Sequence, residues 1–129
     1  MNRVLKAMVL FFILTGITWQ AVAFSEADLE KLKSSLKCPK CDLAGADLSG
    51  TKLAGANLTY ANLDKARFFR AELAGANLSE AVLTGSDLFN ADLTDAVLTD
   101  AKLNWVKNLN KAILCRTTMP DATVDNSGC

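Results

Sequence analysis

The sequence contains no histidine among its 129 residues. This absence excludes catalytic sites that use histidine as the base for a serine or cysteine nucleophile, and metal sites built on imidazole ligands. Net charge is also absent, because 14 lysines and arginines balance 14 aspartates and glutamates. A nucleic-acid-binding protein needs a clustered basic excess, so the composition predicts no nucleic acid partner. The length allows one domain.

The first 23 residues have the composition of a secretory signal peptide. Arg3 and Lys6 provide a positive start, an apolar run follows from Ala7 to Trp19, and residues 21–23 form a small-residue cleavage site. The 13-residue apolar run is shorter than the roughly 18 residues that span a bilayer. We therefore expect cleavage before residue 24, no stable membrane anchor afterwards, and a location in the bacterial periplasm or outside the cell.

All four cysteines follow the predicted signal, at Cys38, Cys41, Cys115 and Cys129. An exported chain meets an oxidising compartment, where cysteines form disulfides. The even number of cysteines predicts two bridges.

A five-residue repeat dominates the remaining sequence from Cys41 onward. Thirteen successive units keep a large apolar residue at the third place, and ten of them have alanine at the first place. The third-place residues are Leu43, Leu48, Leu53, Leu58, Leu63, Phe68, Leu73, Leu78, Leu83, Leu88, Leu93, Leu98 and Leu103.

A period of five fits neither common regular structure. Five residues advance about 500° around an α-helix, so successive leucines would drift by about 140° and form no apolar stripe. On a flat strand, an odd period would move the leucine to the opposite face in each new unit. The chain must therefore turn a corner in every unit, which predicts a solenoid with a leucine core.

The units Ala46-Asp47-Leu48, Ala56-Asn57-Leu58 and Ala91-Asp92-Leu93 resemble the pentapeptide-repeat family. The resemblance implies an all-β fold, the right-handed quadrilateral β-helix, with four units per coil and about three coils over residues 41–105. Residues 20 apart should then stack on one face. Such stacking would place Phe69 over Phe89 on an outer wall.

The two ends of a solenoid need caps, because each exposes the apolar interior. Ser25 and Asp28 resemble a helix N-cap, and Leu29, Leu32 and Leu36 follow at helical spacing. We expect a short helix over residues 25–37 within an N-terminal cap at 24–40. Residues 106–129 are expected to hold a degenerate last repeat and a C-terminal cap. The cysteine-containing segments at both ends resemble an exported subgroup of the family.

In such a rod the two cysteine pairs lie at opposite ends, about 15 Å apart, whereas a disulfide needs Cα atoms within about 7 Å. We therefore expect Cys38 to pair with Cys41 and Cys115 with Cys129, and no zinc site built from four thiolates. An alternative is a redox role for the Cys38-Pro39-Lys40-Cys41 dithiol.

The sequence predicts no catalytic residue, no metal site and no cofactor. The least expected exposed residues are Phe69 and Phe89, with Tyr60 and Arg70 expected nearby, and they form a candidate interaction surface. We therefore expect a non-enzymatic scaffold or protein-interaction module with an unidentified protein partner. A homodimer through an outer face or a coil end is also considered. Some relatives mimic DNA and modulate the topoisomerase gyrase, which the resemblance adds as a further alternative.

Overall fold

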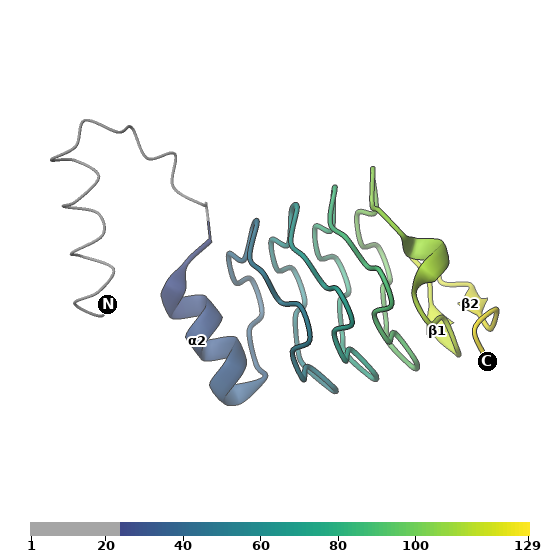
Figure 1. The fold of residues 1–129 in the computed structure, drawn as a ribbon, viewed down its shortest axis with the longest axis horizontal. Helices are drawn as coiled ribbons and strands as arrows, with labels where there is room; N and C mark the ends of the chain where they lie inside the picture. Colours follow the sequence, from purple (N-terminus) through teal and green to yellow (C-terminus); the bar gives the residue numbers. More distant parts are fainter. Residues whose placement is uncertain (1–23) are drawn as a thin grey trace, which may run out of the picture.

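The structure is a computed structural model that describes residues 24–129. It is a coil that begins beside one helix and ends in a short hairpin (Figure 1). The elements are helix α2 (Glu26–Ser35), the 3₁₀ turn η1 (Leu109–Lys111), and strands β1 (Thr117–Thr118) and β2 (Val124–Asp125). The predicted signal peptide at residues 1–23 lies outside the described residues. Within residues 24–129, no helix is long and apolar enough to cross a membrane.

Helix α2 lies across the first coil and is tied to it by polar contacts. Its N-cap Ser25 accepts a hydrogen bond from the Asp28 N–H at 3.2 Å. The Asp28 carboxylate accepts from the Asp42 N–H at 2.8 Å, and the Ser25 N–H donates to the Asp42 carbonyl at 2.9 Å. Leu32 is fully buried under the helix. The helix therefore covers the apolar interior that the first coil would expose.

The coil has four walls, because residues 20 apart pair through single parallel β-bridges. Each wall contributes one bridging residue per coil, so long strands do not form. The second-place residue of a unit bonds to the preceding coil, as the Asn57 N–H donates to the Leu36 carbonyl and the Asn57 carbonyl accepts from the Cys38 N–H, both at 2.8 Å. The first- and third-place residues beside it bond to the following coil. The four ladders are Lys37-Asn57-Asn77-Val97-Thr118, Asp42-Asn62-Val82-Lys102, Asp47-Arg67-Asp87-Lys107 and Lys52-Glu72-Asp92-Ile113.

The corners explain why the second place of the unit is so often aspartate or asparagine. At a corner, the first residue of the next unit donates back to the third residue of the current one, as Ala46 N–H does to the Leu43 carbonyl at 3.0 Å. The fourth-place N–H has no such backbone partner, and the second-place side chain accepts its hydrogen bond instead. The Asn57 Oδ1, for example, accepts from the Thr59 N–H at 3.1 Å. The fifth place takes a left-handed conformation, with φ of 74° at Gly45.

The core is the column of third-place side chains, with the first-place alanines packed beside it. Twelve of the thirteen predicted inward residues are at most 1% exposed, and Phe68 is the largest of them. Leu103 is only half-buried, since it belongs to the last coil and no further coil covers it. At the first place of one unit, Ser86 replaces alanine and is fully buried.

The coil extends beyond the 41–105 segment of regular repeats, for which about three turns are expected. The bridged ladders begin at Lys37 and continue to Thr118. The regular pattern ends sooner because one extra residue follows Lys107: Asp87 pairs with Lys107 at a spacing of 20, and Asp92 pairs with Ile113 at 21. The turn η1 lies in this interval. The backbone therefore keeps its walls after the sequence has lost the repeat.

Candidate functional site

The exposed side chains that could contact a partner lie at the corners of the coil and at the outward second places of its walls, because the interior is filled. At the fifth place of every unit φ is positive, and this left-handed conformation is found at residues with large side chains as well as at glycine. Bulky residues adopt it at a cost of about 1–3 kcal/mol each. The non-glycine fifth-place residues are Lys40, Tyr60, Lys65, Arg70, Glu80, Asn90, Asp95, Asp100 and Trp105.

One corner presents an aromatic pair, which we call the phenylalanine corner and define as Phe69, Arg70 and Phe89. The rings of Phe69 and Phe89 stack with centroids 5.6 Å apart and an interplanar angle of 5°. The Arg70 guanidinium carbon lies 5.0 Å from the Phe69 ring centroid, a cation–π contact of about 0.5–1 kcal/mol at an exposed site. Phe69 is 40% exposed. The two rings and the guanidinium therefore form one contiguous exposed cluster.

Tyr60, which the sequence grouped with these residues, lies at a different corner. Ten residues are half of a four-sided coil, so Tyr60 and Arg70 occupy diagonally opposite corners. Tyr60 instead neighbours Glu80, one coil further on. The Glu80 carboxylate, as a hydrogen-bond acceptor and as a negative charge, raises the pKa of Tyr60 above its ordinary value. The interaction surface expected from the sequence is therefore divided, with three of its four residues together.

Trp105 is the functional candidate that the sequence analysis missed. Its side chain is 86% exposed, more than any other large hydrophobic residue described. It also occupies a fifth place with φ of 58°. The sequence does contain a signal for it, because a tryptophan stands at the fifth place of its unit, where five of the other units have glycine.

The N-terminal cysteines form a buried bridge, Cys38–Cys41, with Cα atoms 5.3 Å apart. Cys38 is fully buried and Cys41 is 3% exposed. Disulfide exchange requires an attacking thiolate to reach a sulfur atom, and this burial blocks the approach. The pair also follows the C-terminus of α2, whereas a reactive cysteine is typically activated at a helix N-terminus.

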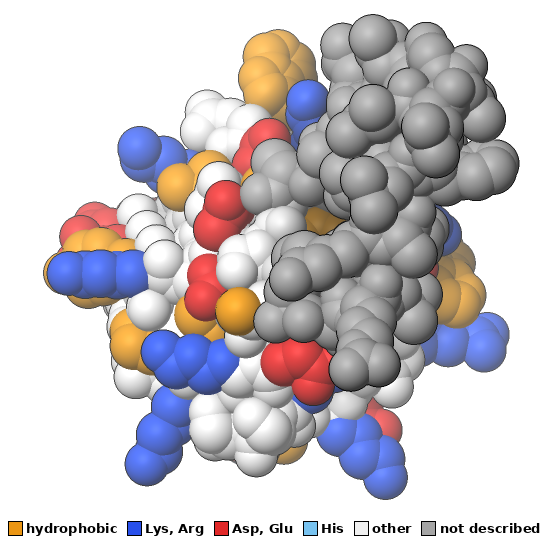
Figure 2. Space-filling model, turned by 90° about the vertical axis from the view of Figure 1, so that its left-hand side faces the viewer, with side chains coloured by type: hydrophobic (Ala, Val, Ile, Leu, Met, Phe, Trp, Pro, Cys, Tyr) orange, Lys and Arg blue, Asp and Glu red, His pale blue; other side chains and the backbone are white. Residues whose placement is uncertain are grey.

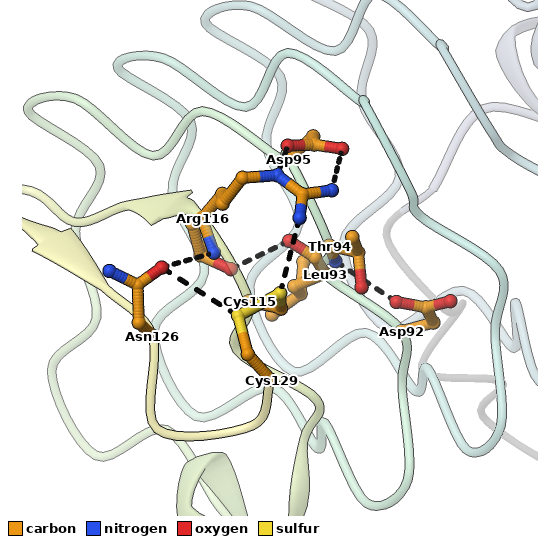
Figure 3. A network of polar contacts seen from close by, with 9 residues as sticks. Asp92, Leu93, Thr94, Asp95, Cys115, Arg116, Asn126 and Cys129 are labelled. Atoms are coloured by element: carbon orange, nitrogen blue, oxygen red, sulfur yellow. Dashed lines mark hydrogen bonds and ion pairs between the residues drawn. A yellow bond between two sulfur atoms is a disulfide. The ribbon is translucent and has the colours of Figure 1, made fainter.

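The C-terminal bridge, Cys115–Cys129, closes the tail onto the last coil, with Cα atoms 4.7 Å apart (Figure 3). Arg116 makes a two-pronged contact with Asp95, from Nε at 2.7 Å and from Nη2 at 2.8 Å. The hydrogen bond from Arg116 holds the pKa of Asp95 below its ordinary value. The Asn126 side chain accepts from the Arg116 N–H at 3.0 Å. These contacts hold the tail against the last coil.

Nothing in the described part of the chain gathers three cysteine, aspartate or glutamate side chains around a possible metal position. Charges of both signs alternate along the rod, as in the ladder Asp47-Arg67-Asp87-Lys107. Seen from the end that carries α2, basic side chains project in several directions between acidic ones (Figure 2).

Comparison with known proteins gives a consistent family. A sequence profile described as "Pentapeptide repeats" matches residues 40–75 and 66–104. Among solved structures, alr5209, a pentapeptide repeat protein from Nostoc PCC 7120, is 30% identical with a TM-score of 0.63, over 73% of this chain and 78% of that one. A search of curated proteins finds no match.

Two further solved structures are similar. HetL, a pentapeptide repeat protein involved in heterocyst differentiation regulation in Nostoc sp. PCC 7120, is 34% identical with a TM-score of 0.43, over 69% of this chain and 43% of that one. Rfr23 from Cyanothece 51142 is 19% identical with a TM-score of 0.52, over 63% of this chain and 89% of that one. The four-sided coil is thus a right-handed β-helix, and no enzymatic family is indicated.

Proposed function

This chain belongs to the pentapeptide-repeat family, and from that premise we propose that it is an exported, non-enzymatic interaction module that binds a protein partner. The phenylalanine corner is the observation that carries the proposal. Stacked aromatic rings and an arginine are the side chains most enriched in the energetic centres of protein interfaces. Here they stand on a rigid coil, so little conformational entropy would be lost on binding.

Export is proposed from two features that agree. Residues 1–23 have the composition of a signal peptide, and all four cysteines outside that segment are paired in the structure. Structural disulfides persist in oxidising compartments such as the periplasm and the extracellular space. Cell fractionation combined with a free-thiol count tests this proposal. Protein found in the cytoplasm with four free thiols would refute it.

Two other functions are less well supported. A redox role would need access to Cys38 and Cys41, two residues that are at most 3% exposed. A DNA mimic would need an acidic wall, but each of the four ladders contains at least one lysine and none is continuously acidic. The phenylalanine corner therefore remains the best supported site.

The partner is tested by crosslinking and affinity capture from cells that express the full chain. We expect the double variant Phe69→Ser, Phe89→Ser to lose the partner that the wild type retains. Tyr60→Ser is the matched control, since Tyr60 is an exposed aromatic residue on the opposite corner. Equal capture by the double variant and the control would contradict the proposal. Sedimentation at several concentrations identifies the case in which the partner is a second copy of the chain.

A further inference from the structure

A notch lies at the other edge of the wall that ends in the phenylalanine corner. Three consecutive coils form it: Lys65 and Arg67 lie on the first, Gly85 and Asp87 on the second, and Trp105 and Lys107 on the third. These six residues line one open cavity of about 420 Å³. The residues of the first and third of these coils are exposed, and Gly85 and Asp87 on the second are half-buried. Neighbouring coils are about 4.8 Å apart, so the notch is roughly 10 Å wide.

The notch is open because Gly85 has no side chain between two long ones at the same corner. A Cβ on Gly85 would lie 3.4 Å from the Lys65 Cγ, so the lysine stem already leans over this position. On the other side stands the Trp105 indole, which is 86% exposed. The notch therefore has a basic edge at Lys65, a floor of backbone at Gly85 and an aromatic edge at Trp105.

The cations of the notch are not neutralised by the chain itself. In residues 24–129, neither Lys65 nor Lys107 takes part in an ion pair, and Arg67 reaches Asp47 only at 3.7 Å between two exposed side chains. One oxygen of the Asp87 carboxylate already has hydrogen-bond donors, because its Oδ1 accepts from the Asn108 side chain at 2.7 Å and from the Phe89 N–H at 3.1 Å. The notch thus has an excess of positive charge.

Trp105 carries two unfavourable features at once. Its left-handed backbone is shared by the fifth place of every unit, and it costs a bulky residue about 1–3 kcal/mol. Its φ is 58°, and its indole is left in water. A bound partner that covers the indole would offset the cost of its exposure. Tryptophan and arginine are also the residues most enriched among interface hot spots.

We propose that this notch binds an extended acidic peptide segment of the partner protein, with its carboxylates on Lys65, Arg67 and Lys107 and an apolar group on Trp105. The inference rests on the proposed interaction function, because the notch and the phenylalanine corner lie at the two edges of one wall. A peptide fits better than a nucleic acid because Asp87 lies between the cations. A peptide backbone offers N–H donors to the Asp87 carboxylate, whereas the backbone of a nucleic acid offers phosphates that Asp87 and Asp47 repel.

Tryptophan fluorescence gives a direct readout. The chain has two tryptophans, Trp19 and Trp105, so the full chain carrying Trp19→Phe reports on the notch alone. We expect acetylated, amidated hexaglutamate to produce a saturable blue shift of its emission at low salt, because the methylene groups of a bound glutamate side chain would supply the apolar surface that covers the indole. Binding should weaken as salt is added. Hexalysine and hexaserine should produce no shift.

Matched variants separate the notch from general charge. Lys65→Gln with Lys107→Gln should lower hexaglutamate affinity five- to tenfold. Lys52→Gln with Lys102→Gln, which removes the same charge from two other walls, should change it less than twofold. No saturable shift, equal losses in both pairs, or tighter binding of a thymidine decanucleotide than of hexaglutamate would overturn the proposal.

The two proposals fail separately. If hexaglutamate does not bind but partner capture still depends on Phe69 and Phe89, the notch is excluded and the interaction module stands. If capture does not depend on these residues but hexaglutamate binds through Lys65 and Lys107, the phenylalanine corner is excluded instead.

Discussion

Replacing Gly55 by alanine isolates the cost of the left-handed corner from the cost of packing. Gly55 occupies a fifth place with φ of +71°, and a Cβ there would meet no heavy atom within 4 Å. The added methyl group enters open space, so any destabilisation comes from the backbone. The left-handed conformation costs about 1–2 kcal/mol for a residue with a Cβ, and alanine regains about 0.4–1 kcal/mol by restricting the unfolded chain. The central values of these two terms, about 1.5 and about 0.7 kcal/mol, leave an expected loss in the free energy of unfolding of about 0.8 kcal/mol.

Urea denaturation followed by circular dichroism, with both disulfides intact, measures this loss. Gly55→Asn is the matched control, because asparagine visits the left-handed region more readily than alanine and should be less destabilising. Thermal unfolding provides a second measure, since 1 kcal/mol shifts the midpoint by about 4–8 °C in a domain of this size. If the alanine variant were as stable as the wild type, the left-handed fifth place would not be the constraint that shapes the corner.

Three further predictions concern the core and the tail. Phe68→Ala should lower the free energy of unfolding by about 3–5 kcal/mol, measured by urea denaturation, because Phe68 is fully buried in the column; a loss below 1 kcal/mol would mean that the column collapses around the gap. Ser86→Ala should leave stability unchanged or raise it by about 1 kcal/mol in the same assay, since the buried Ser86 Oγ has no hydrogen-bond partner within residues 24–129; a clear loss would reveal a partner. In an NMR titration, Arg116→Gln should raise the pKa of Asp95 toward its ordinary value, because the Arg116 hydrogen bond lowers it. Since the folded-state pKa is the lower one, the pair stabilises the wild type above the ordinary aspartate pKa of about 3.9, and this contribution is lost as the pH falls through the lowered value; an unchanged pKa in the variant would contradict the contact.

The repeat could be predicted from the sequence because it satisfies one strict condition, a large apolar residue at every fifth position. That condition places Leu43 and the following third-place residues on one side of a turning chain without any knowledge of the structure. Beyond Leu103 the sequence no longer meets this condition, because one added residue shifts the five-residue repeat. The walls nevertheless continue to Thr118. Strict periodicity therefore predicts the regular coil of residues 41–105, and the degenerate last repeat expected after it contains Ile113, which pairs with Asp92.

The exposed surface was harder to predict, because it depends on which corner each residue occupies. Residues 20 apart stack, so the spacing that brought Phe69 to Phe89 was readable from the sequence. Tyr60 is closer to Phe69 in sequence and yet lies half a coil away. Trp105 could not be identified from the periodic pattern, because that pattern restricts the inward first and third places and leaves the exposed fifth place free to vary. The notch becomes visible only when three coils are considered together.

The 20-residue spacing also determines which insertions and deletions the chain could tolerate. Adding one whole coil between Gly85 and Trp105, or removing residues 85–104, would keep every later residue at its own corner, but the addition would widen the notch and the removal would close it. Adding a single five-residue unit would preserve the core equally well, yet it would rotate everything after it by one wall and carry Trp105 away from the corner of Lys65. The fold is thus indifferent to changes that would abolish the surface, so variation in repeat number offers a way to lose or move a binding site while the scaffold stays intact.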